Sequence, residues 1–172
     1  MRKIILNVAV SLDGLIEGPN GEYDWCFTDQ DYGMAAFMKR IDTIFYGRKS
    51  YEVMLAAESG GENPFGKIKS YVFSSSRSVP FKETELVSGD LVQQVNAIKQ
   101  LPGKDIWLFG GASLTTSFLN DGLVDEMSLA VHPILLGSGK PLFQNIEGRR
   151  KLNLIGSKSY STGLVILNYA LV

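Results

Sequence analysis

The sequence has almost none of the residue types on which many metal sites and nucleophilic enzymes depend. Among 172 residues there is one cysteine, Cys26, and one histidine, His132. A single cysteine excludes an intrachain disulfide and a cysteine-based metal site, and a single histidine excludes a histidine cluster. A Ser-His-Asp triad would have to be built around His132, and no Gly-x-Ser-x-Gly turn accompanies it. We therefore expect neither a metal site nor such a hydrolase.

An excess of charge and long apolar runs are also missing. The net charge of −1 gives no basic surface, so we expect no nucleic-acid partner. No apolar run approaches the roughly 20 residues of a membrane-spanning helix, and the first residues alternate like a strand, with no signal-peptide cleavage site. With 45% hydrophobic and 20% charged residues, the composition is that of a soluble globular protein. We expect a single cytoplasmic domain over residues 1–172, without membrane contact.

Strand and helix patterns alternate along most of the chain. Thr28 and Asp31 have the spacing of a helix cap, and they precede a helical pattern that continues to Ile41. Apolar and polar residues alternate in two segments, 151–160 and 164–172, and this pattern predicts an antiparallel hairpin. The predicted strands are 3–12, 43–46, 68–75, 85–87, 106–109 and 126–132. Together these patterns predict a three-layer α/β/α domain with a mixed, mostly parallel sheet and a C-terminal antiparallel hairpin.

The clearest functional pattern lies at Gly110-Gly111. A buried strand ends there and an amphipathic helix begins, with Leu114 and Phe118 on one face. Glycines let the backbone approach a pyrophosphate, and the helix N-terminus favours its negative charge. A purely structural turn is the alternative.

A second junction, Gly47-Arg48-Lys49-Ser50, has the same strand-glycine-helix form. Its basic residues lie in the first helical turn, where the dipole disfavours them, so an anionic ligand would explain them. They could instead be solvated surface charges.

A third candidate phosphate site follows the strand predicted at 68–75. Ser74-Ser75-Ser76-Arg77 supplies three hydroxyls and a guanidinium at the sheet edge where ligands bind in open α/β folds, and these groups suit a phosphate monoester. Arg77 could equally be an exposed loop residue. The G-x-G-x-x-G fingerprint is absent after the first strand, which disfavours an ordinary Rossmann dehydrogenase.

These motifs resemble the dihydrofolate reductase-like superfamily, and more closely the reductase domain of bacterial riboflavin biosynthesis and its stand-alone relatives. The resemblance runs nearly from end to end. Its motifs are Ser11-Leu12-Asp13-Gly14, Gly47-Arg48-Lys49-Ser50, Ser75 with Arg77, Gly110-Gly111-Ala112-Ser113-Leu114, Val124-Asp125-Glu126, Pro133-Ile134-Leu135-Leu136-Gly137 and Pro141-Leu142-Phe143.

The resemblance implies binding of NADPH and hydride transfer to a carbonyl or imine of a heterocycle, as in 5-amino-6-(5-phosphoribosylamino)uracil reductase. Leu15 and Ile16 would lie near the nicotinamide, and Ser75 and Arg77 would receive the adenosine 2′-phosphate. The remaining cofactor-binding candidates are Gly47, Arg48, Lys49, Ser50, Gly110, Gly111, Ala112, Ser113 and Leu114.

The chain departs from these families around the substrate. Phe109 stands where the riboflavin enzymes usually have a glutamate before the two glycines, which removes a polar substrate contact. The dihydrofolate reductases have Pro-Trp before their catalytic carboxylate, whereas this chain has Asp24-Trp25. Asp29 and Asp31 both remain candidates for the proton donor. They could also be helix N-terminal charges that the dipole favours.

Aromatic residues could stack on a flat heterocycle. Trp25, Phe27 and Phe37 are the candidates for stacking, although aromatic residues at such spacing also serve as core, and Phe109 is a further candidate substrate residue. Two other functions are open: a non-catalytic, ligand-sensing nucleotide-binding dimer, and a dihydrofolate reductase proper, which would bind methotrexate-type ligands tightly. The hairpin offers apolar strand edges, so we expect a homodimer.

Overall fold

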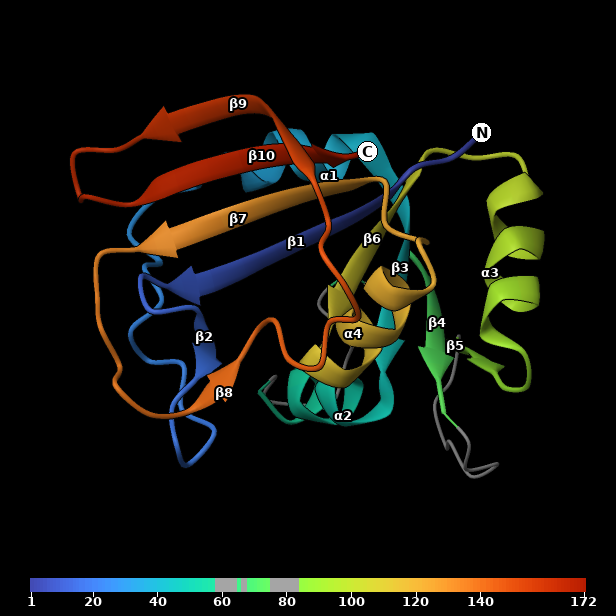
Figure 1. Ribbon diagram of the computed structural model, residues 1–172, viewed down its shortest axis with the longest axis horizontal. Helices are drawn as coiled ribbons and strands as arrows, with labels where there is room; N and C mark the ends of the chain where they lie inside the picture. Colours follow the sequence, from blue (N-terminus) through green and yellow to red (C-terminus); the bar gives the residue numbers. More distant parts are fainter. Residues whose placement is uncertain (58–64, 66–67, 75–83) are drawn as a thin grey trace.

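An eight-stranded mixed sheet forms the centre of the fold, with the strand order β5-β4-β3-β6-β1-β7-β10-β9 (Figure 1). The computed structural model describes residues 1–57, 65, 68–74 and 84–172. The strands are β1 (Ile4–Ser11), β3 (Ile41–Gly47), β4 (Lys69–Phe73), β5 (Thr84–Val87), β6 (Asp105–Gly110), β7 (Glu126–His132), β9 (Leu152–Ser159) and β10 (Val165–Leu171). The first six strands in this spatial order pair in parallel, and β10 pairs antiparallel with both β7 and β9. The predicted fold class is confirmed, including the C-terminal hairpin.

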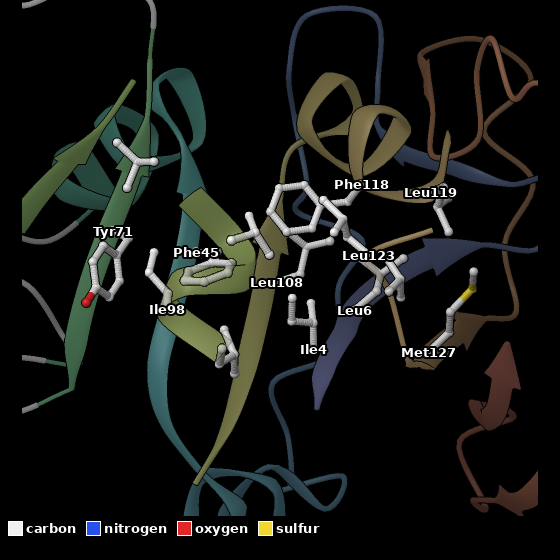
Figure 2. Packing of buried hydrophobic residues seen from close by; sticks show 14 residues of the cluster. Ile4, Leu6, Phe45, Tyr71, Ile98, Leu108, Phe118, Leu119, Leu123 and Met127 are labelled. Carbon is white, nitrogen blue, oxygen red and sulfur yellow. The ribbon is translucent and has the colours of Figure 1, made fainter. Parts of the chain in front are cut away.

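Helices cover both faces of the sheet. On one face, α1 (Met34–Arg40) and α2 (Arg48–Ala57) pack against a cluster that includes Ile44, Val72 and Trp107. On the other face, α3 (Leu91–Gln100) and α4 (Ala112–Asn120) pack against a larger cluster. Figure 2 shows Phe118 of α4 grouped with Leu108 and Leu6 of the central strands. We call these faces the α1 face and the α4 face.

Coverage on both sides explains the unbroken apolar runs of the central strands. Successive side chains of a strand point to opposite faces. In β6, Ile106 and Leu108 belong to the cluster on the α4 face, whereas Trp107 and Phe109 belong to the α1 face. A strand buried on both sides therefore shows no polar alternation in its sequence.

The first helix begins later than its sequence pattern predicts. Helix α1 begins at Met34, and Asp31 caps it: Oδ1 accepts from the N–H of Ala35 at 2.8 Å and Oδ2 from that of Gly33 at 3.0 Å. Tyr32 and Gly33 have positive φ angles of 49° and 87°, which a right-handed helix cannot contain. The prediction of a cap at Thr28 was therefore wrong.

A small second sheet was not predicted. Strand β2 (Leu15–Glu17) pairs antiparallel with β8 (Lys140–Pro141) beyond the end of β1 (Figure 1). Its two strands lie more than 120 positions apart in the sequence, so no local pattern indicates their pairing. In the described ranges, no helix combines the length and apolar character needed to cross a membrane.

Candidate functional site

Two of the three predicted junctions lie side by side at one edge of the sheet. Strands β3 and β6 are parallel neighbours, and they end at Gly47 and Gly110, with Tyr46 opposite Gly110. Strand β4 ends next to β3, since Phe73 pairs with Gly47. Ser75 and Arg77, which were predicted to follow this strand, lie outside the described residues.

The glycines allow the two junctions to touch. A Cβ atom on Gly47 would lie 3.4 Å from the carbonyl oxygen of Gly110 and 3.5 Å from the nitrogen of Gly111. A Cβ atom on Gly111 would lie 2.8 Å from Oγ of Ser50, closer than such atoms normally approach. The Gly110–Gly111 peptide bond is cis. The glycines thus have a packing role, and because they lack side chains they also leave the backbone uncovered at this edge.

The N-terminus of α4 offers hydrogen-bond donors at the same edge. Its N-cap residue is Gly111, which provides no side-chain cap, and no side chain among the described residues accepts from the first N–H groups, those of Ala112 to Leu114. The buried hydroxyl of Thr115 has no hydrogen-bond partner within the described part of the chain. Helix α2 begins directly after Gly47. These donors fit a diphosphate group such as that of a dinucleotide.

The basic residues of the second junction are exposed. Nε of Arg48 donates to Oε1 of Glu52 at 2.7 Å, an ion pair one turn along α2. This contact favours a surface role for Arg48, although an exposed side chain can also turn to a ligand. Lys49 makes no ion pair with any described residue, and Ser50 is half-buried against Gly111.

The Ser-Leu-Asp-Gly motif ties two loops together. Asp13 accepts hydrogen bonds from the hydroxyl of Ser11 at 2.6 Å, the N–H of Gly137 at 2.8 Å and that of Leu136 at 3.2 Å. These bonds lower the pKa of Asp13 to about 2, that of Ser11 having the largest effect. Ser11 also accepts from the N–H of Leu15 at 2.9 Å. The motif therefore fixes β2, in which Leu15 is buried and Ile16 half-buried.

A cavity of about 410 Å³ lies on the α1 face, and none of the junction glycines lines it. Helix α1 with the residues before it and strands β1, β7, β9 and β10 form its walls. Its polar and charged lining residues are Asn7, Asp31, Tyr32, Arg40, Glu126, Ser128, Lys158, Tyr160 and Asn168, and its apolar ones include Ile5, Met34, Phe37 and Ile166.

The predicted substrate residues are divided between two places. Phe37 lines the cavity, and its ring contacts Trp107 at 5.4 Å between centroids. Trp107 contacts Phe109 at 5.1 Å, so an aromatic row connects the cavity to the residue before Gly110. Trp25 instead packs on His132 at 5.3 Å and does not line the cavity.

The two candidate proton donors differ in position. Asp31 lines the cavity, but both of its oxygens accept from backbone N–H groups at the start of α1. Asp29 does not line it, and Oδ1 of Asp29 accepts from the hydroxyl of Tyr32 at 2.6 Å. The geometry gives Asp31 a capping role, and its catalytic role stays a prediction.

His132 is held as a neutral structural side chain. The N–H of Phe27 donates to Nε2 at 3.1 Å, which leaves the proton on Nδ1 to be donated to the carbonyl of Ala130 at 3.0 Å. Burial lowers the pKa of His132 below its usual value. Within the described residues, no three histidine, cysteine or acidic side chains are grouped so that they could hold a metal ion.

Sequence reasoning missed the polar residues of the cavity floor. Asn7, Ser128 and Asn168, which we call the polar row, project from β1, β7 and β10 into the cavity. Each one interrupts an apolar run: Asn7 in IILNVAV, Ser128 in EMSLAV and Asn168 in VILNYAL. Such single polar interruptions of a buried strand were the available signal, because buried polar groups normally need a partner.

Comparisons with known proteins agree with this architecture. The sequence profile of the RibD C-terminal domain family matches residues 2–166. The chain is 44% identical over 177 residues to the uncharacterized protein YyaP of Bacillus subtilis (strain 168), a match that covers 98% of this chain and 94% of YyaP.

Solved structures give the same result. A candidate riboflavin biosynthesis protein from Shewanella sp. PV-4 superposes with a TM-score of 0.87 at 30% identity, over 100% of this chain and 99% of the other. Dihydrofolate reductase from Enterococcus faecalis, complexed with NADP(H) and RAB-propyl, shares the fold with a TM-score of 0.72 at 13% identity, over 98% and 96% of the two chains. The chain belongs to the RibD C-terminal domain family.

Proposed function

We propose that the protein is an NADPH-dependent reductase that transfers hydride to a small heterocyclic substrate, in the manner of 5-amino-6-(5-phosphoribosylamino)uracil reductase. The observation that carries the proposal is the contact between two bare glycine junctions, beside the uncapped N-terminus of α4. An aromatic row connects this edge to a cavity of about 410 Å³, which is a suitable size for a small ligand.

The proposed cofactor contacts follow from this edge. When bound, NADPH supplies the hydride. Gly47, Gly110 and Gly111 let its phosphates approach the backbone, and the N–H groups of Ala112, Ser113 and Leu114 neutralise their charge. Arg48, Lys49 and Ser50 border the same edge, and Leu15 and Ile16 would contact the nicotinamide. Ser75 and Arg77 would bind the 2′-phosphate, which makes the preference for NADPH over NADH the decisive property.

Catalysis in such a site is chiefly orientation. The residues bring the donor and acceptor carbons within ~3–3.5 Å of each other. The proton would come from water or from a carboxylate, and Asp31 is the better placed of the two candidates because it lines the cavity while Asp29 does not. We place the protein in the cytoplasm, where NADPH is available and a lone cysteine stays reduced.

A fluorescence titration tests the cofactor assignment. Trp107 is 4% exposed and lies between Phe37 and Phe109, so its emission should be quenched when a ligand binds nearby. A Trp25→Phe background leaves Trp107 as the only tryptophan. We expect tight binding of NADPH and much weaker binding of NADH, and binding of neither would overturn the proposal.

Charge variants then test the phosphate contacts. Arg48→Ala and Arg77→Ala should weaken NADPH binding, whereas Arg149→Ala, an exposed arginine of the loop before β9, should not. Unchanged NADPH affinity in both test variants would remove the basis for assigning Arg48 and Arg77 to the cofactor phosphates.

A second function is favoured by two observations. Both oxygens of Asp31 are engaged in the helix cap, and Phe109 provides no polar group, so the fold could bind a dinucleotide as a sensor without turnover. Absorbance of NADPH, followed over a broad panel of heterocycles, separates the two functions: oxidation indicates the reductase, and binding without oxidation indicates the sensor. Tight binding of methotrexate would instead indicate a dihydrofolate reductase proper.

We also propose that the protein is a homodimer through β9. This strand forms one edge of the sheet, and Leu152, Leu154 and Ile155 on it are exposed by 39%, 57% and 56% (Figure 1). A long apolar edge strand invites pairing with another chain. Light scattering should give a dimer mass that Leu154→Lys reduces to the monomer and that Val53→Lys, at an exposed position of α2, leaves unchanged. A monomeric wild-type protein would contradict this.

A further inference from the structure

A second cavity lies at the edge of the sheet opposite the glycine junctions. Its volume is about 410 Å³, and Met1, Arg2, residues 99–103 and Asp105 line it. These residues lie at the starts of β1 and β6 and at the end of α3, where the N-terminal segment runs beside the chain that leaves α3 (Figure 1). Strand β6 has 6 residues, or about 17 Å at ~3.3 Å per residue, so this cavity is remote from Gly110. We call it the N-terminal pocket.

Arg2 is a buried cation with unused hydrogen-bond donors at this pocket. It is 8% exposed, Nε donates to the carbonyl of Lys104 at 2.5 Å, and Nη2 donates to Asp42 and Thr43. Nη1 makes no hydrogen bond with any described residue, and it is not sealed from solvent. Because Arg2 lines the N-terminal pocket, the N–H groups of Nη1 are available to a ligand there.

Lys99 supplies a second cation to the same pocket. Its side chain is 10% exposed, and Nζ donates to Oδ2 of Asp125 at 2.7 Å. An ammonium group carries three N–H donors, so this ion pair leaves two of them unused. Polar groups in such places are normally satisfied, so Lys99 can take a further acceptor.

The carboxylate of Asp105, which also lines the pocket, has no free oxygen to offer these donors. Oδ1 accepts from the N–H of Lys3 at 2.9 Å, and Oδ2 accepts from Nε of Arg40 at 2.8 Å. The C-terminal end of α3 alone would disfavour an anion, but Lys99 lies in its last turn and opposes the helix dipole. The pocket therefore has an excess of free donors over free carboxylate oxygens.

Gly103 and its neighbours complete the walls of the pocket. A Cβ atom on Gly103 would lie 2.6 Å from Oδ2 of Asp42 and 3.1 Å from Cζ of Arg2. The glycine therefore leaves this side of the ion pair without a covering side chain. Leu101, which is 45% exposed, and Pro102 add an apolar surface beside the two cations.

We propose that the N-terminal pocket binds a small organic oxyanion, a carboxylate or a phosphate monoester, whose oxygens accept from Arg2 and Lys99 and whose carbon skeleton packs on Leu101 and Pro102. Guanidinium and ammonium groups form strong, charge-assisted hydrogen bonds with such oxygens. The volume of the pocket suits a ligand of this size. The inference goes beyond the proposed function, because it assigns a second ligand site that is separate from the cofactor edge.

Benzoate, phenyl phosphate and benzamide are matched probes, because they carry a carboxylate, a phosphate monoester and a neutral amide on the same ring. In a ¹⁵N NMR titration at constant ionic strength, at least one of the two anions should shift the backbone amides of Leu101 and Gly103 saturably. Each cation is already paired once, so we expect saturation at millimolar concentrations, and benzamide should bind far more weakly. Tighter binding of phenyl phosphate would assign the site to phosphate monoesters, and tighter binding of benzoate would assign it to carboxylates.

Two variants test the cations without removing their structural contacts. Lys99→Gln removes the charge and keeps an N–H donor for Asp125, whereas Arg2→Lys keeps a cation beside Asp42 and removes the planar fork. Each should weaken binding of the preferred anion about tenfold. The matched control is Lys151→Gln, which removes the same charge at an exposed position before β9 and should leave the affinity unchanged.

Leu101→Ser tests the apolar wall at an exposed position, where the substitution does not threaten folding, and it should weaken binding about threefold. The inference is overturned if benzamide binds as tightly as the anions, if the shifts do not saturate, or if Lys99→Gln and Arg2→Lys both bind like the wild type. The amides of Gly111 and Ala112 report separately on the cofactor edge. Shifts confined to these two amides would support the phosphate site there and overturn the N-terminal one.

Discussion

The carboxylate of Asp13 accepts a hydrogen bond of 2.8 Å from the backbone N–H of Gly137, which lies 124 positions further along the chain. Its other oxygen accepts from Ser11 and from the N–H of Leu136. One side chain thus fastens the loop after β1 to the loop after β7. The motif that resembles a reductase signature has a structural function here.

Asp13→Asn should lower the melting temperature at neutral pH, because an NH₂ group cannot replace both acceptors. The folded-state pKa of about 2 lies below the usual value of about 3.9, so the contribution of the carboxylate is complete above about pH 4 and is lost as pH falls through about 2. The difference in melting temperature should therefore shrink in acid. Asp121→Asn, at an exposed turn after α4, is the control and should change the melting temperature at neutral pH little.

His132 should make stability fall in weak acid. Folding lowers the pKa of His132 below its unfolded value of about 6.5. Above this pH the side chain is neutral in both states, so it does not make the unfolding free energy depend on pH. Below this pH the unfolded state binds the proton more readily than the folded state does. His132 is the only histidine, so the loss of unfolding free energy that begins as pH falls below about 6.5 is assigned to it. His132→Gln should cost roughly 1–3 kcal/mol at pH 7 and should abolish this slope in urea titrations. A variant that keeps the slope would contradict the assigned neutral state.

Gly111→Ala should destabilise the protein by roughly 1–3 kcal/mol, because its Cβ atom would overlap Oγ of Ser50 at 2.8 Å. Since the obstructing atom is a single hydroxyl oxygen, Ser50→Ala should remove most of the penalty in the double variant. Unfolding free energies of the four proteins form a double-mutant cycle. Additive effects would mean that the two junctions do not contact each other in solution.

Glu126→Gln should cost roughly 1–2 kcal/mol, because Lys3 loses its carboxylate and Arg40 keeps only that of Asp105. Burial alone would raise the pKa of Glu126, but hydrogen bonds from Lys3 and Arg40 and their charges outweigh burial and lower it. The effect should therefore diminish as pH falls into the acidic range, and salt should reduce it because both cations are partly exposed. Glu85→Gln, in an exposed pair with Lys69, should stay within about 0.5 kcal/mol. Equal effects in the two variants would show that burial at Glu126 does not matter.

The local spacing of apolar residues was sufficient to predict much of the fold. The strand predicted at 126–132 coincides with β7, and the strand predicted at 106–109 lies within β6. These elements are recognisable because burial imposes a spacing on apolar residues that each segment carries by itself. The start of α1 was not recognisable, because it depends on left-handed residues at Tyr32 and Gly33 that the capping pattern does not reveal.

For the site, the sequence by itself determined the glycine junctions, because strand, glycine and helix follow one another within a few residues at Gly47 and at Gly110. Only the tertiary structure decided that these junctions touch, through the parallel pairing of β3 with β6. It also decided the cavity floor: Asn7, Ser128 and Asn168 are far apart in the chain and become neighbours through strand register alone. A shift of one residue in any of these strands would turn its polar side chain into the core. The long-range pairing of the strands therefore sets this part of the site, and local sequence preference does not.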